Sequence, residues 1–205
     1  MSWACIGYFL RTKLIRAGYQ SPYPDYPDAQ FPAPAHIDEI CSAGICPRGL
    51  GDSALDSDEK WNRFFGMDGY EAPEKAYQVV PKELLSKVEL YVFRIAPTLF
   101  RDGLQQPFDP VPTIPEPPVG PFERLGYDAV QYSHGELCCS PLVCNSLAGK
   151  PDIPAVNRFC LMETIDDAFT LATACSLGRG EPGPYVVIEV CRSLEPLRSN
   201  GNVTA

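Results

Sequence analysis

Two proline-rich stretches limit how much of this chain can form regular secondary structure. Residues 18–35 contain five prolines, and residues 102–121 contain seven. Proline fixes φ and carries no backbone N–H, so neither stretch can join a continuous helix or a central strand. We therefore expect two long loops that cross a folded core, the first of them rich in tyrosine.

The segments between these loops carry the signals of regular elements. Thr164 and Asp167 form a capping box before an amphipathic run that ends at Gly178, which predicts a helix. Shorter helices are expected at 56–65 and 82–86. Apolar, β-branched and aromatic runs predict strands at residues 3–10, 88–95, 127–132, 158–162 and 185–191. The strand at 158–162, the helix after Thr164 and the strand at 185–191 together predict a βαβ-like unit.

These elements together predict one α+β domain over residues 1–192. We expect a mixed or antiparallel sheet of about five strands, with two or three helices and the long proline-rich loops. Residues 193–205 are polar and are expected to form a flexible tail.

The charge of the chain restricts its partners. Against 17 Lys and Arg there are 26 Asp and Glu, a net charge of -9. Such a surface repels phosphate backbones and anionic lipid, so we expect another protein as partner, with no nucleic acid and no membrane. The apolar residues 3–10 are followed, not preceded, by basic side chains, the reverse of a secretory signal, which predicts a cytoplasmic protein.

A cysteine-rich pattern, Cys-Ser followed by three residues and Cys, occurs twice. Its copies are Cys41–Cys46 and Cys139–Cys144. Four thiolates are a ligand set for structural zinc, so these four cysteines are candidate metal ligands. The apolar residues between the thiols favour the alternative, in which the cysteines are small buried packing residues. A redox pair within each copy is a third possibility.

The loop after the predicted strand 127–132 could also hold a thiol enzyme. His134 lies close to Glu136 and Cys139. A histidine base oriented by a carboxylate activates a cysteine nucleophile, so these three residues are candidate catalytic residues, with Cys138 as the alternative nucleophile and Asp128 as the alternative carboxylate.

The segment Gly126-Tyr127-Asp128-Ala129-Val130 resembles the Gly-Tyr-Asp-x-Val strand of some ADP-ribosyltransferase-like folds. That resemblance implies that Arg94 binds a nicotinamide cofactor and that Glu136 supplies the acid. The Ser-Thr-Ser strand and the Glu-x-Glu turn of that family are missing from this sequence.

A wider resemblance covers most of the C-terminal half. The segments Cys139–Ala148, Val156–Leu161 and Gly183–Val190 are similar to a family of small, uncharacterised bacterial proteins. This resemblance implies a bacterial setting and brings no activity or site with it.

The sequence thus favours a non-enzymatic protein-interaction or regulatory module. The negative charge and the stiff, aromatic proline-rich segments support that function. The alternative is an enzyme whose active-site loop spans His134 to Cys144, either thiol-dependent or ADP-ribosyltransferase-like.

Overall fold

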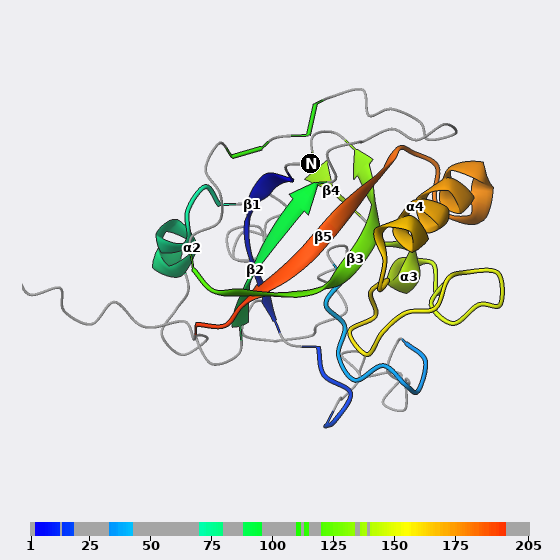
Figure 1. The fold of residues 1–205 in the computed structure, drawn as a ribbon, viewed down its shortest axis with the longest axis horizontal. Helices are drawn as coiled ribbons and strands as arrows, with labels where there is room; N and C mark the ends of the chain where they lie inside the picture. Colours follow the sequence, from blue (N-terminus) through cyan, green and yellow to red (C-terminus); the bar gives the residue numbers. More distant parts are fainter. Residues whose placement is uncertain are drawn as a thin grey trace, which may run out of the picture.

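The computed structural model describes residues 3–12, 14–18, 33–42, 70–79, 88–95, 110–111, 113–114, 120–133, 136–138 and 140–195 (Figure 1). The predicted helices at 56–65 and 82–86 lie outside the described residues. So do most of the two proline-rich stretches and the last ten residues of the predicted tail.

The described part of the chain is built on one antiparallel sheet. Four long strands follow the order β1 (Ala4–Thr12), β2 (Val88–Ile95), β5 (Tyr185–Ser193) and β3 (Phe122–Ser133). A two-residue strand, β4 (Glu136–Leu137), pairs with the end of β3. The α+β class is confirmed, and the sheet is antiparallel. The count of about five strands is not confirmed as predicted, since β4 has only two residues and pairs only with the end of β3.

Two helices contact different strands of this sheet. α4 (Ile165–Ala174) contacts β3 and β5, whereas α2 (Pro73–Val79) contacts the edge strand β1 (Figure 1). The backbone N–H of Asp167 donates to Oγ1 of Thr164 at 3.1 Å, so the predicted helix start is confirmed. α4 continues into one π-helical turn, η4 (Cys175–Arg179), and α3 (Pro141–Cys144) is a single turn.

The predicted strand at 158–162 and the βαβ-like unit are wrong. This segment forms a turn, from which Met162 alone bridges Tyr127 on β3 and also Val156. Asn157 holds the turn, because its side-chain oxygen accepts from the backbone N–H of Phe159 and of Leu161. An asparagine that binds the backbone ahead of it favours a turn over a ladder, although the apolar residues suggested a strand.

Both outer edges of the sheet carry additional backbone bonds. On β1, Tyr8 exchanges two N–H···O bonds with Tyr70, at 2.9 and 2.7 Å. On β3, the same exchange joins Tyr127 to Met162 at 2.9 and 2.8 Å. Such cover protects edge strands from pairing with another chain.

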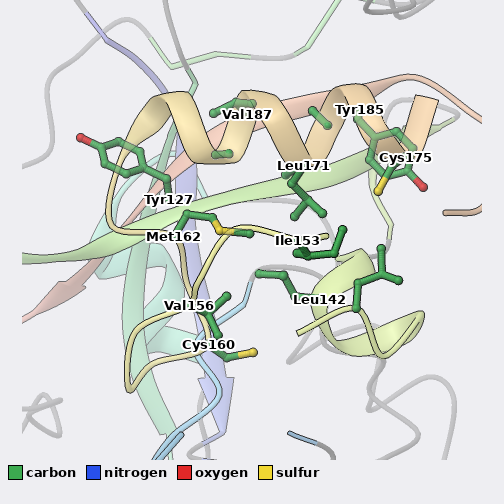
Figure 2. Close-up of a cluster of buried hydrophobic side chains, with 14 of the residues drawn as sticks. Tyr127, Leu142, Ile153, Val156, Cys160, Met162, Leu171, Cys175, Tyr185 and Val187 are labelled. Carbon is green, nitrogen blue, oxygen red and sulfur yellow. The ribbon is translucent and has the colours of Figure 1, made fainter. Parts of the chain in front are cut away.

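The core fills both faces of the sheet. On the face toward α4, Tyr127, Tyr185 and Val187 pack with the helix residues Leu171 and Cys175 (Figure 2). Loop residues complete this cluster, among them Leu142, Ile153, Val156 and Cys160. The other face buries a second cluster that includes Phe9, Tyr91, Phe93, Val186, Ile188 and Val190. Residues alternate between the faces along β5, as a strand buried on both sides requires.

Candidate functional site

The serines of the two Cys-Ser copies meet at one buried carboxylate. Asp128 on β3 is fully buried, and it accepts a hydrogen bond from the hydroxyl of Ser42 at 2.7 Å. Its other oxygen accepts from the hydroxyl of Ser140 at 2.9 Å. Both serines are buried as well. A carboxylate in an apolar core needs such donors, so we call this group the serine clamp.

Ser140 reaches Asp128 because its hydroxyl does not cap its own helix. It stands at the N-cap of α3, yet its side chain makes no capping hydrogen bond. The carbonyl of Ser140 accepts from the backbone of Val143 and Cys144, which closes the turn without the side chain. The hydroxyl is therefore directed into the core, where it fixes α3 against β3.

The described cysteines of the motif are packed in different ways. Cys41 is buried, and the hydroxyl of Tyr91 lies 3.5 Å from its sulfur. Burial, followed by the charge of Glu39, raises the pKa of the Cys41 thiol far above its ordinary range. Cys144 is half-buried, whereas Cys46 and Cys139 lie outside the described residues. Among the described residues, no three Cys, His, Asp or Glu side chains group as a metal site requires, and a zinc site of all four cysteines stays a prediction.

The other buried thiols are poor nucleophiles. Burial, followed by the charge of Asp128, raises the pKa of Cys160 and of Cys175 to about 12 each. Burial, then Glu189, raises the pKa of Cys191 to about 11. Burial likewise raises the pKa of Cys5. A thiol with a raised pKa stays protonated at neutral pH, so Cys5, Cys175 and Cys191 act as small buried core residues.

A second polar cluster holds residues 33–42 on the sheet. The guanidinium of Arg192 on β5 binds Glu39 at 3.0 Å, Glu89 at 3.4 Å and Glu123 at 3.6 Å. Arg16 supports the same segment through the carbonyls of Ile37, Ala33 and Pro34. These contacts join distant parts of the chain, and we assign them a structural role.

The third cluster lies at the centre of the sheet. Arg94 on β2 pairs in register with Glu189 on β5, and Glu189 pairs in register with Tyr127 on β3. Residues that are directly opposite point to the same face, so these three side chains form one row. The guanidinium of Arg94 makes an ion pair with the carboxylate of Glu189. We call Arg94, Glu189 and Tyr127 the central row.

The two charges of the central row differ in exposure. The side chain of Arg94 is 31% exposed, whereas that of Glu189 is 3% exposed. The Nε atom of Arg94 is buried and has no hydrogen-bond partner among the described residues. The sulfur of Cys191 lies 3.8 Å from Glu189, and Cys5 pairs in register with Arg94 on the other side. Glu189 is thus a buried acid whose charge is balanced by the partly exposed side chain of Arg94.

An aromatic side chain crosses the central row. The indole of Trp3 lies 6.0 Å from the guanidinium carbon of Arg94 and 5.9 Å from the ring of Tyr127, on which it stacks. Arg124, on the same strand as Tyr127, donates to the hydroxyl of Tyr127 at 3.1 Å. Cation–π and stacking contacts of this kind orient planar groups.

The structure describes the side chain of only one of the predicted catalytic residues His134, Glu136, Cys139 and Arg94. Arg94 lies at the central row, but His134 and Cys139 fall outside the described residues, as does the side chain of Glu136 on β4. Sequence reasoning missed Glu189 as a site residue. The available signal was one acid within the apolar strand 185–191, where a charge is costly unless it is paired.

Neither a protein-family model nor a curated protein nor a solved structure matches this chain. No helix in the described ranges is long and apolar enough to cross a membrane.

Proposed function

We propose that this protein binds a small anionic ligand at the central row and acts on it with Glu189 as the acid–base group. The observation that carries the proposal is the partly exposed side chain of Arg94 beside the buried carboxylate of Glu189. Arginine has five N–H donors in a planar fork, which suits recognition of carboxylate and phosphate. A carboxylate out of water is the kind of group that proteins adapt for proton transfer.

Stability alone is a weak reason for this ion pair. A buried ion pair often contributes no more than a well-packed apolar pair of the same size. The neighbouring rows of β2 and β5 are apolar, with Val92 and Val187 buried on the same face. The charges at the centre of this face therefore support a functional role.

The resemblance to ADP-ribosyltransferase-like folds suggests a specific form of this proposal, in which the ligand is a nicotinamide cofactor. It implies that Arg94 binds a nicotinamide cofactor. In our proposal Glu189, the partner of Arg94, takes the role of the acid in place of Glu136. The raised pKa values of the buried thiols favour this form over a thiol-dependent enzyme at the same row.

The proposal is tested by binding and turnover in matched variants. Isothermal titration with ADP should show saturable binding that becomes about tenfold weaker or more in Arg94→Lys, because the second N–H of the fork is lost. Arg179→Lys is the control, since Arg179 pairs with Asp152 at the surface. Incubation with a nicotinamide dinucleotide tests the specific form. In this reaction water adds to the ribose carbon as its bond to nicotinamide breaks, and Glu189 takes the proton from that water. Glu189→Gln should therefore release nicotinamide about a hundredfold more slowly or worse, with binding retained. Equal ADP affinity in wild type and Arg94→Lys contradicts the proposal.

A second proposed function is a protein-interaction or regulatory module. It is supported by the contacts of Arg16, Arg192 and Asp128, which hold residues 33–42, a segment that includes the end of the first proline-rich stretch, on the sheet. The net charge of -9 favours a basic partner protein. Native mass spectrometry at low salt tests it: a stoichiometric partner that is released at high salt is expected, and a monomer under both conditions contradicts it.

A further inference from the structure

We propose that Trp3 is a built-in lid whose indole occupies the place of the ligand's planar ring, so that ligand binding displaces it. This inference rests on the proposed ligand site at the central row. It adds how that site is regulated and which ligand class it takes.

The geometry places the indole above Glu189. Arg94 and Tyr127 are the in-register neighbours of Glu189 on either side. Trp3 contacts both neighbours, at 6.0 Å and 5.9 Å, and must therefore span the residue between them. This position also accounts for the 3% exposure of Glu189 beside a neighbour that is 31% exposed.

Trp3 can leave this place without disrupting the sheet. It precedes β1, whose pairing with β2 begins at Ala4 and Cys5. Figure 1 shows this start of β1 beside the end of β2. A ring stack or a cation–π contact changes an equilibrium by only about tenfold each, so a ligand that supplies the same contacts can replace the indole.

The surroundings of the indole define the ligand class. A ring in its place would lie against a guanidinium on one side and a tyrosine ring on the other, which suits a planar heteroaromatic group. An anion attached to that ring would reach Arg94, and Arg124, which contacts the ring and hydroxyl of Tyr127, offers a second cation. Nucleotides combine a planar base with phosphate, and they are the class that we infer.

Titration of Trp3→Ala and Trp3→Phe distinguishes an indole that blocks the ligand from one that helps to bind it. The probes are ADP, which has a base, and pyrophosphate, which has none. We expect Trp3→Ala to bind ADP about tenfold more tightly than wild type, a gain of about 1.4 kcal/mol, with a smaller gain for pyrophosphate. Trp3→Phe keeps a ring and should behave like wild type. Leu177→Ala, at an 80% exposed residue, is the control and should change nothing.

The outcomes distinguish the two proposals. If Trp3→Ala binds ADP as tightly as wild type or more weakly, while binding still depends on Arg94, the lid is overturned and the ligand site survives. If neither protein binds either probe, both proposals fail. If Trp3→Ala does not fold, as judged by circular dichroism, Trp3→Leu is titrated in its place with the same expectation.

Discussion

Removal of the serine clamp should destabilise the fold in a coupled way. Ser42 and Ser140 each donate to Asp128, at 2.7 and 2.9 Å, and Asp128 is fully buried. A hydrogen bond to a charged group contributes about 1.5–3 kcal/mol, so Ser42→Ala and Ser140→Ala should each lower the free energy of unfolding by about 2 kcal/mol. After one hydroxyl is lost, the other still stabilises the carboxylate. The double variant should therefore lose more than the sum, about 5 kcal/mol.

Urea unfolding followed by circular dichroism measures these free energies in one double-mutant cycle. Ser176→Ala is the matched control, because its half-buried hydroxyl, in the turn η4, donates to the carbonyl of Ala172 in α4 at 2.9 Å. That bond is local and neutral, and alanine is the better helix former, so the change should stay within about 0.5 kcal/mol.

The cycle can refute the serine clamp. If either single variant costs less than about 0.5 kcal/mol, its hydroxyl does not stabilise a buried carboxylate. If the two losses simply add, the serines do not share one acceptor. In both cases the repeated Cys-Ser pattern would need another explanation.

Three further predictions concern the ion pair of Arg94, the backbone at two glycines and the pH dependence of the buried thiols. Arg94→Met should lower the free energy of unfolding by about 3–5 kcal/mol, measured by urea titration, because it leaves a buried carboxylate unpaired; a loss below about 1 kcal/mol would show that this carboxylate reaches water. Gly126→Ala should cost about 2–4 kcal/mol, since φ is +152° and a Cβ would lie 2.7 Å from the carbonyl oxygen of Met162. Gly178→Ala, with φ +102° and open space, should cost less, and equal melting temperatures would contradict this. Burial raises the pKa of Cys160 and Cys175 to about 12 from 9.0. The free energy of unfolding should therefore be highest below pH 9, where the thiols are protonated in both states, and should fall between pH 9 and 12. For Cys160 the fall is about 1.4 kcal/mol per pH unit. A free energy of unfolding that does not change between pH 8 and 10.5 would contradict this.

Local signals in the sequence were sufficient for much of the fold. Alternation predicted β2 at its observed bounds, and the capping box of Thr164 marked the start of α4. The segment 158–162 was wrongly predicted as a strand because its side chains are apolar for a reason other than strand formation. Cys160, Leu161 and Met162 fill the core from a turn. Period and composition report burial, and they cannot separate a buried strand from a buried turn.

The site depended on contacts between residues that are distant in sequence. The repeated Cys-Ser pattern drew attention to the thiols, yet the serines are the side chains that meet. Ser42 and Asp128 are 86 residues apart, and no local pattern reports such a pair. Glu189 becomes a candidate site residue only because the antiparallel register places Arg94 opposite it.

The ligand site at the central row is tested most directly by NMR during titration with ADP. The resonances to follow are the Nε–H groups of Arg94 and of Arg179, and the indole N–H of Trp3, assigned with single variants. We predict that Arg94 and Trp3 shift together and saturate at one affinity, while Arg179 stays unchanged. Shifts that spread over all arginines without saturation, or no shift at Arg94, would contradict a ligand site at the centre of this sheet.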